Sequence, residues 1–182
     1  MVPEGVTSIG NEAFWGCFSM TEATIPESIT SIGNGAFMGC ISMIDIVIPE
    51  GVTSIGRRAF SGSGLTSISI PSSLTSIGDE AFDGCGYLTS ITMSDSLTSI
   101  GNLAFNDCRV IESITIPDGV TSIGYAAFLN CRNLTSITIP DSVTDIGIFA
   151  FSGCPNLVVT CSPNSYTHQY CVKNSIICAF PV

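Results

Sequence analysis

Residues 89–108 read TSITMSDSLTSIGNLAFNDC, and this stretch recurs along the chain with few changes. Its Ala-Phe pair returns at a nearly constant interval, with spacings of 23, 23, 22, 23, 23 and 23 residues between successive phenylalanines. These are Phe14, Phe37, Phe60, Phe82, Phe105, Phe128 and Phe151. Seven copies at one period are typical of a solenoid, in which each copy forms one coil that stacks on the next.

Three apolar columns repeat together with the phenylalanine. Alanine precedes every repeat Phe, isoleucine lies five residues before it, and an aliphatic residue lies eight residues before it. A unit this short cannot bury these side chains alone, but stacked coils place each column against its own copy at the spacing of paired strands, about 4.8 Å. The sequence therefore predicts a continuous core. Segments of the Ser-Ile-Thr-Ile type are expected to be short parallel strands with inward isoleucines, at 90–93, 113–116 and 136–139.

The rest of each coil is predicted from its prolines, glycines and polar residues. Proline after the strand ends pairing and begins a turn, and the Val-Thr-Ser-Ile segment that follows is expected to be a second, irregular extended stretch. Glycine follows the isoleucine of that segment, where we expect a positive φ or a tight corner. Asn11, Asn34, Asp79 and Asn102 are then expected to begin one helical turn as N-caps. The turn closes at residues that tolerate a left-handed conformation, namely Gly16, Gly39, Gly62, Gly84, Asp107, Asn130 and Gly153.

The repeats divide the chain into two parts of a single domain. Residues 1–157 hold about seven copies, and residues 158–182 depart from the pattern. Met1 is followed by residues that already lie inside a copy, so the first copy is truncated and we expect the array to continue upstream. No signal peptide is visible, which leaves the compartment open.

Two irregularities have a structural prediction of their own. Copy three is one residue short between Ser63 and Leu65, which predicts a trimmed loop and an unbroken stack. The C-terminal segment is expected to cover the open end of the core. It should do so with a strand at 158–161, a helix within 163–174 and a strand at 176–180.

The repeat resembles the BspA-like leucine-rich repeats, also called the Treponema pallidum type. The resemblance rests on Ile-Pro-x-Ser-Val-Thr-Ser-Ile-Gly-x-x-Ala-Phe-x-x-Cys-x-x-Leu-Thr-Ser-Ile and covers roughly residues 2–157. It implies a β-rich leucine-rich-repeat solenoid of α/β-type units, right-handed, with a distinct C-terminal cap. It also implies surface display and adhesion to host cells or matrix proteins. The motif assigns no catalytic or binding residues.

The composition argues against several classes of function. Fifteen acidic residues face five basic ones, a net charge of −10, whereas nucleic-acid binding needs a basic surface. No apolar run approaches the roughly 20 residues of a membrane span. The chain has one histidine, and its glycines belong to the repeat rather than to a phosphate-binding loop. We therefore expect no catalysis, no cofactor, no metal ion, no nucleic acid and no membrane insertion.

Six of the nine cysteines lie three residues after the repeat Phe: Cys17, Cys40, Cys85, Cys108, Cys131 and Cys154. We interpret this column as small buried thiols at the corner of the coil. The spacing of coils permits disulfides between them, but parallel Cβ directions disfavour such bridges. Cys161, Cys171 and Cys178 lie in the cap, where one pair could form a disulfide. A zinc site that combines them with His168 is a weaker alternative, because the chain has no Cys-x-x-Cys pair.

Two outward surfaces repeat along the chain. Acidic residues occupy the turn after the strand, and we interpret them as solvated, with loose calcium binding or a basic partner as alternatives. They are Glu4, Glu27, Glu50, Asp95, Asp118 and Asp141. The outward strand face is interpreted as flat, small and polar, and a regular Ser/Thr grid would also suit ordered water, as on ice-binding solenoids. It comprises Glu22/Thr24, Asp45/Val47, Ser67/Ser69, Ser90/Thr92, Ser113/Thr115 and Ser136/Thr138.

Large side chains beside the Ala-Phe turn are the candidates for partner binding, because tyrosine and arginine often anchor protein interfaces. They are Arg57, Arg58, Tyr87, Arg109, Tyr125 and Arg132. The sequence and the resemblance together predict a non-enzymatic protein-interaction module, with adhesion at the cell surface or outside the cell as its expected role. An intracellular or structural repeat scaffold and an ice-binding solenoid are the alternatives.

Overall fold

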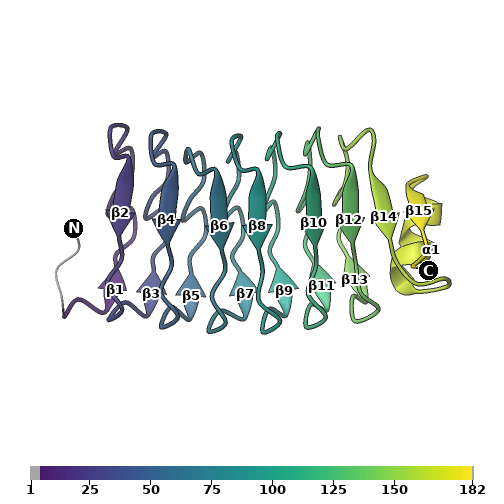
Figure 1. The fold of residues 1–182 in the computed structure, drawn as a ribbon, viewed down its shortest axis with the longest axis horizontal. Helices are drawn as coiled ribbons and strands as arrows, with labels where there is room; N and C mark the ends of the chain where they lie inside the picture. The colour runs from purple at the N-terminus through teal and green to yellow at the C-terminus, as the bar shows by residue number, and fades with distance from the viewer. Residues whose placement is uncertain (1–4, 182) are drawn as a thin grey trace.

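The computed structural model describes residues 5–181, which form a solenoid with two rows of short parallel strands (Figure 1). One row consists of three-residue strands: β2 (Glu22–Thr24), β4 (Asp45–Val47), β6 (Ser67–Ser69), β8 (Ser90–Thr92), β10 (Ser113–Thr115), β12 (Ser136–Thr138), β14 (Val158–Thr160) and β15 (Ile177–Ala179). The other row consists of two-residue strands: β1 (Ser8–Ile9), β3 (Ser31–Ile32), β5 (Ser54–Ile55), β7 (Ser76–Ile77), β9 (Ser99–Ile100), β11 (Ser122–Ile123) and β13 (Asp145–Ile146).

Strand pairing follows the repeat and confirms the predicted solenoid. Ile114 of β10 lies beside Ile137 of β12, and both are buried, while the flanking serines and threonines are exposed. The Val-Thr-Ser-Ile segment is more regular than expected, because its Ser-Ile residues pair in parallel from coil to coil. Most coils therefore contribute one isoleucine to the core from each row, and Ala23 and Val159 take that place in β2 and β14.

The repeat phenylalanines form a continuous stack through the core. Neighbouring rings lie 5.1–5.6 Å apart between centroids, and their planes differ by at most 9°. Phe37, Phe60, Phe82, Phe105 and Phe128 are completely buried. Because the rings stack this closely, each one packs against the ring of the next coil. This contact links the stability of neighbouring coils.

The Ala-Phe segment is a run of turns in place of the expected helical turn. In residues 103–108, alternate N–H groups bond in two directions. The N–H groups of Leu103, Phe105 and Asp107 donate to carbonyls of the next coil at 2.8 Å, and those between them donate to carbonyls three residues back in their own coil. Bonds between coils leave no room for the i to i−4 pattern of an α-helix.

The glycine after the repeat isoleucine has a different role from the positive φ that we expected. A Cβ on Gly124 would lie 2.6 Å from the backbone of Asn102 and Gly101, so the glycine permits close approach of two coils. Positive φ occurs two residues later, at Glu12, Gly35, Arg58, Glu80, Leu103, Ala126 and Phe149. The predicted left-handed residues at the end of the turn, from Gly16 to Gly153, do have positive φ.

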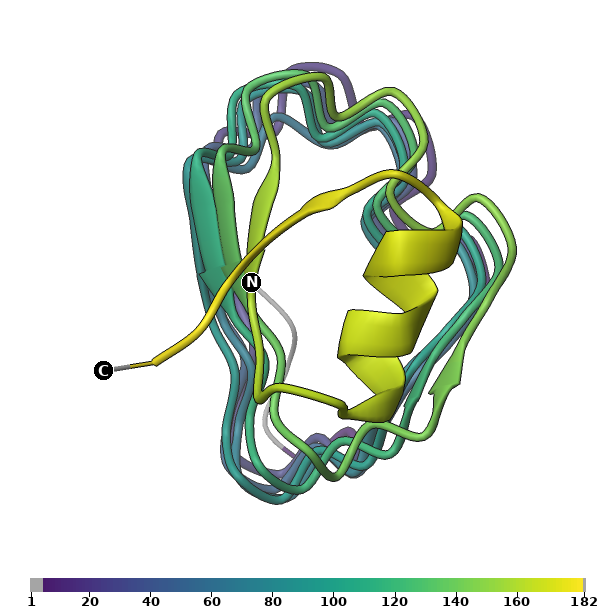
Figure 2. The same cartoon turned by 90° about the vertical axis from the view of Figure 1, so that its right-hand side faces the viewer.

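The C-terminal segment closes the end of the core. Its helix α1 (Tyr166–Lys173) begins after Ser165, whose side chain accepts a hydrogen bond from the backbone N–H of His168. Strand β15 pairs in parallel with β14, and α1 lies across the end of the coil (Figure 2). Within residues 5–181, no helix is long and apolar enough to span a membrane.

The shortened third copy interrupts hydrogen bonding without breaking the stack. Strand β4 pairs with β2 but not with β6, and β5 pairs with β3 but not with β7. The rings of Phe60 and Phe82 nevertheless stack at 5.4 Å. Both rows of strands thus lack ladder pairing at the shortened copy, while the coils stay in contact and the core stays continuous. The three-residue row is also interrupted between β8 and β10.

Candidate functional site

The six side chains predicted to bind a partner are all exposed but lie in separate places. Arg57 and Arg58 each form an ion pair with Glu80, and Tyr125 packs against Phe149 further along the chain. Tyr87 and Arg109 line one depression, and Arg132 is not among its lining residues. The structure therefore divides the predicted edge into distinct surfaces.

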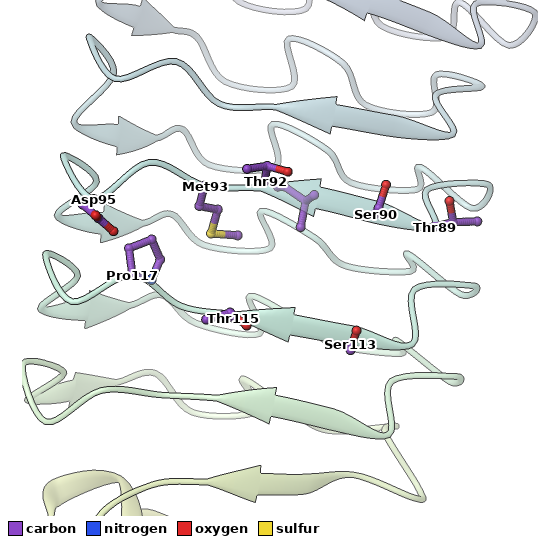
Figure 3. A pocket seen from close by; sticks show the side chains of 9 residues that line it. Thr89, Ser90, Thr92, Met93, Asp95, Ser113, Thr115 and Pro117 are labelled. Carbon is purple, nitrogen blue, oxygen red and sulfur yellow. The ribbon is translucent and has the colours of Figure 1, made fainter.

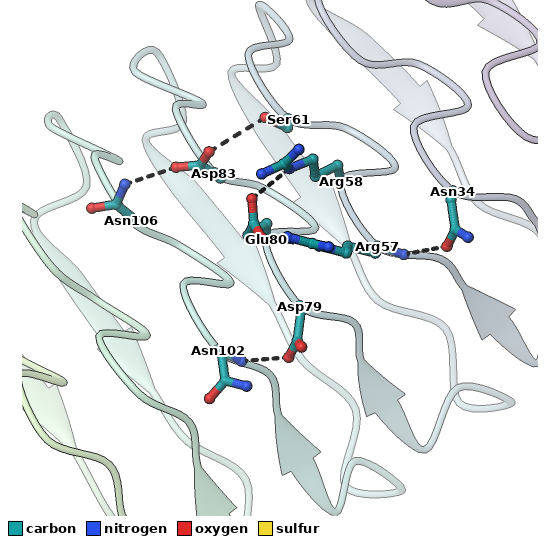
Figure 4. A network of polar contacts seen from close by, with 9 residues as sticks. All are labelled: Asn34, Arg57, Arg58, Ser61, Asp79, Glu80, Asp83, Asn102 and Asn106. Atoms are coloured by element: carbon teal, nitrogen blue, oxygen red, sulfur yellow. Dashed lines mark hydrogen bonds and ion pairs between the residues drawn. The ribbon is translucent and has the colours of Figure 1, made fainter.

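Arg57 and Arg58 both bind the carboxylate of Glu80 on the neighbouring coil (Figure 4). The Glu80 side chain is only 10% exposed, while the two guanidinium side chains are about half exposed, at 59% and 48%. Burial acts to raise the pKa of Glu80, but the hydrogen bonds and charges of the two arginines outweigh it and lower the pKa. Both arginines are thus engaged in holding coils three and four together.

Replacing Glu80 by glutamine should reduce the free energy of unfolding by about 1–2 kcal/mol at pH 7, because two guanidinium groups lose their carboxylate while solvent screens part of the effect. The folded pKa of Glu80 lies below its ordinary value, so its contribution is present at neutral pH and is lost as the pH falls through the folded pKa. Urea unfolding at pH 7 and in acid measures the difference in free energy of unfolding between wild type and Glu80→Gln. This difference should disappear below about pH 4.

The matched control for Glu80 is Glu112, an exposed glutamate that forms no ion pair within the described residues. Glu112→Gln should change the free energy of unfolding by less than about 0.5 kcal/mol. If the difference in free energy of unfolding between wild type and Glu80→Gln stayed constant from neutral to acid pH, the ion-pair interpretation would be contradicted.

The asparagine column bridges coils instead of capping helical turns. Asn11 Oδ1 accepts a hydrogen bond at 2.8 Å from the backbone N–H of Asn34, its counterpart 23 residues later. The same bond joins Asn34 to Arg57 and Asp79 to Asn102 (Figure 4). It also joins Asn102 to Tyr125. Beyond Tyr125 the column changes to the exposed Ile148, followed by the exposed Phe149 at φ 63°.

Tyr87 and Arg109 both line a depression of about 470 Å³, which we name the edge groove. Its lining includes Ile41, Gly64, Gly86, Tyr87, Asp107 and Arg109. Tyr87 is 68% exposed and Ile41 is 59% exposed, so both present apolar surface to solvent. The Arg109 guanidinium is oriented by Asp107, which accepts bonds of 3.0 Å and 2.6 Å from its Nε and Nη2 atoms.

Ile41 was missed as a candidate because isoleucine usually indicates the core. The signal was available in the alignment of copies, since the corresponding positions carry Arg109 and Arg132. An aliphatic residue at a position that carries arginine in two other coils is expected to point outward as they do.

The outward face of the three-residue strands is small and polar in most coils but not in all. Serine and threonine side chains line a shallow depression of about 330 Å³ between β8 and β10, where the strand row is interrupted (Figure 3). On β4, by contrast, Asp45 and Val47 are exposed. Val47 thus makes the outward face of the second coil less polar than that of the other coils. Of the acidic turn residues, Glu4 lies outside the described residues.

The cysteine column lies mostly in the core. Cys40, Cys85, Cys108 and Cys131 are fully buried, Cys154 is half-buried, and Cys17 is exposed. From Cys40 onward, each thiol of this column donates to the carbonyl of the repeat Phe in the preceding coil at 3.1–3.3 Å. Burial raises the pKa of Cys40 and Cys85 to about 11. These thiols are therefore protonated and unreactive at neutral pH.

The three cap cysteines approach one another from different elements. Cys161 follows β14, Cys171 lies in α1 and Cys178 lies in β15, and all are free thiols. Burial, followed by the neighbouring Cys178, raises the pKa of Cys161 to about 11. Within residues 5–181, no group of three or more His, Cys, Asp or Glu side chains is placed to hold a metal ion.

Comparison with protein families identifies the repeat independently. The family described as BspA type leucine-rich repeat region matches in six copies, over residues 1–88 and 75–178. Comparison with curated proteins finds no match.

Solved structures share the same architecture. A leucine-rich repeat protein of T. pallidum is 29% identical, with a TM-score of 0.58 over 77% of this chain and 58% of that one. The pneumococcal vaccine antigen PcpA is 22% identical, with a TM-score of 0.66 over 88% of this chain and 51% of that one. A leucine-rich repeat protein from Eubacterium ventriosum is 23% identical, with a TM-score of 0.50 over 98% of this chain and 71% of that one. The chain thus spans little more than half the length of the first two.

Proposed function

The chain belongs to the BspA-type leucine-rich repeat family, and from this we propose that it is a non-enzymatic module that binds a protein partner at the cell surface or outside the cell. Leucine-rich repeats of this kind are a protein-interaction family. The surface location rests on what the family resemblance implies. The likeness to PcpA, at 22% identity, supports the fold alone.

The observation that carries the binding proposal is the edge groove. Tyrosine and arginine are the residue types that most often dominate the binding energy of protein interfaces, and a hollow allows a partner to exclude water from them. Tyr87 lies in the edge groove with little of its ring covered, and Asp107 holds Arg109 in one orientation. A side chain that is already oriented loses less entropy on binding.

The rigid coils on either side support this function. The edge groove lies on turns whose backbone is fixed by hydrogen bonds to the neighbouring coils. Gly64 and Gly86 line the edge groove without contributing side chains to it. Variable side chains on a fixed scaffold are the usual arrangement for recognition in solenoids.

We expect the chain to bind immobilised fibronectin or fibrinogen saturably at physiological salt. Tyr87→Ala and Arg109→Ala should each weaken that binding by about 10- to 100-fold, the range of interface hot spots. Surface plasmon resonance with purified partners measures both effects. Absence of saturable binding to either protein would count strongly against the adhesin proposal.

Matched substitutions outside the edge groove separate recognition from general damage. Arg132→Ala removes the same side chain one coil further along, and Tyr166→Ala removes an exposed tyrosine on α1. Both should leave the affinity within about twofold of wild type. Equal losses from all four substitutions would mean that the edge groove is not the binding site.

The free thiols favour a second candidate, an intracellular or structural scaffold. All nine cysteines are unpaired in the structure, as is usual in a reducing compartment. The burial of Cys40, Cys85 and Cys108 keeps these thiols protonated, so they would also persist in an oxidising environment. Antibody labelling of intact cells of the source organism distinguishes the two. Labelling only after permeabilisation would favour the scaffold.

A further inference from the structure

The outward positions of the second coil break the pattern of the other coils. Around β6, β8 and β12 the sequence reads TSIS or TSIT, at 66–69, 89–92 and 135–138. Around β4 the same positions hold Ile44, Asp45 and Val47. Val47 is 73% exposed and Ile44 is 57% exposed. Exposed aliphatic side chains add nothing to the core, so the stacking of coils does not account for them.

These side chains stand between two hollows, one on each side of β4. A depression of about 660 Å³ lies on the β2 side, and a second of about 440 Å³ extends to the β6 side. They share lining residues, including Asp45 and Val47, and therefore form one continuous surface. It follows β4, which lies near the N-terminal end of the strand row in Figure 1. We name it the strand groove and define it by Glu22, Glu27, Ile44, Asp45, Val47 and Glu50.

The β6 side of the strand groove lies beside the third copy, which is one residue short. Strand β6 lies next to β4 but does not form a paired ladder with it, although the Thr66 N–H donates to the Ile44 carbonyl at 3.1 Å. The same interruption occurs between β8 and β10, where no residue is missing, and a hollow lies there too. Of the two hollows, the one beside β4 is lined by an exposed aliphatic side chain, Val47.

The strand groove carries negative charge that the protein does not neutralise. Four of its six residues are carboxylates, and the ion pairs within residues 5–181 involve only Glu80 and Asp107. Glu50 accepts two hydrogen bonds from Ser72, which orient its carboxylate but leave its charge. None of the basic residues of the chain lines the strand groove; they are Arg57, Arg58, Arg109, Arg132 and Lys173.

We propose that the strand groove binds an extended segment of a partner protein that carries both basic and aliphatic side chains on the face turned toward the groove. The lysine or arginine side chains of this segment would approach the four carboxylates, which speeds association and fixes the alignment of the segment along the groove. Its aliphatic side chains would cover Ile44 and Val47. An extended segment fits because the strand groove runs along β4 and continues across the outward face of β6. This site shares no residue with the edge groove, so each of the two proposals can fail alone.

A synthetic peptide that repeats Lys-Lys-Val-Val tests the proposal, because in an extended conformation each face carries both residue types. Fluorescence anisotropy at physiological salt should show saturable binding to the full chain. Peptides that repeat Glu-Glu-Val-Val or Lys-Lys-Ser-Ser should bind at least about tenfold more weakly. Equal binding of the serine peptide, or no binding of the valine peptide, would overturn the proposal.

Substitutions that restore the residues of the other coils identify the site on the protein. Ile44→Thr with Val47→Thr leaves the net charge unchanged and should weaken the valine peptide by about tenfold. Asp45→Ser should weaken it by about threefold or more, whereas Asp118→Ser removes the same charge outside the strand groove and should change the affinity by less than about twofold. If Asp118→Ser weakens binding as much as Asp45→Ser, the attraction is that of a generally acidic protein and the proposal is wrong.

Thermal unfolding of the variants and peptide binding by Tyr87→Ala separate loss of the strand groove from loss of the fold or of the edge groove. Each substitution introduces threonine or serine at a position where other coils already carry one of these residues. The midpoint of thermal unfolding of each variant should therefore match that of wild type within a few degrees. Tyr87→Ala should leave peptide binding unchanged. Loss of fibronectin or fibrinogen binding in that variant therefore bears on the edge groove alone.

Discussion

Replacing Phe105 by alanine should lower the free energy of unfolding by about 3–5 kcal/mol, the cost of removing a large ring from a core that cannot collapse around the cavity. Phe105 is completely buried and stacks on Phe82 and Phe128 at 5.4 Å on either side. Its backbone is fixed in two directions by hydrogen bonds to its own coil and to the next, which limits relaxation into the cavity.

Phenylalanines at the end of the stack and outside it are the controls for Phe105→Ala. Phe14 has the same place in the first coil but is only half-buried and stacks on Phe37 alone, so Phe14→Ala should cost less than Phe105→Ala. Phe18 is exposed, and Phe18→Ala should change stability by less than about 1 kcal/mol. Equilibrium unfolding in urea measures all three. Equal losses at Phe14 and Phe105 would contradict a stack whose strength depends on two neighbours.

The shape of the urea transition should also change in Phe105→Ala. A solenoid gains cooperativity from contacts between neighbouring coils, and this substitution weakens the contact in the middle of the array. The coils on either side should then unfold less cooperatively, with a smaller m-value than wild type. Phe18→Ala should keep the m-value of wild type.

The columns of the repeat allowed the solenoid to be predicted because the core repeats with the sequence. An isoleucine or phenylalanine that returns every 23 residues needs no local context, since its partner is its own copy. The cap was predictable for a related reason: residues 158–182 leave the pattern, and the open end of a stack has to be covered.

The predictions that failed were those that assumed a local partner. Asn102 fits the preference for a helix N-cap, but the N–H that it accepts belongs to Tyr125, 23 residues away. Leu103 has a φ of 54°, which leucine disfavours by about 1–2 kcal/mol, and it gains a hydrogen bond to the next coil in return. Rules for caps and turns consider neighbours in sequence, whereas in this chain neighbours in space are one period apart.

The surfaces were only partly predictable for the opposite reason. Tyr87 and Arg109 were identified because large polar side chains stand out among serines and threonines. Ile41 and Ile44 were overlooked because the core uses the same residue type. Comparing each residue with its own column would have found both, since Ile44 stands among threonines and Ile41 shares its column with Arg109 and Arg132.

Replacing Gly124 by alanine should destabilise the protein by about 2–4 kcal/mol, because the added methyl group meets backbone that cannot turn aside. The new Cβ would lie 2.6 Å from the backbone of Asn102 and Gly101, well inside van der Waals contact. Two coils would have to separate, which would strain the hydrogen bond from the Gly124 N–H to the Ile100 carbonyl, now 2.8 Å.

The same substitution at Gly10 should have the opposite sign. Gly10 occupies this place in the first coil, its φ is not positive, and nothing lies within 4 Å of an added Cβ. There alanine should stabilise the protein by up to about 1 kcal/mol, because it restricts the unfolded chain more than the folded one. Urea unfolding of the two variants thus separates close approach of coils from the intrinsic preference of glycine. If both substitutions destabilised equally, the glycine column would be required for its backbone conformation and not for the contact between coils.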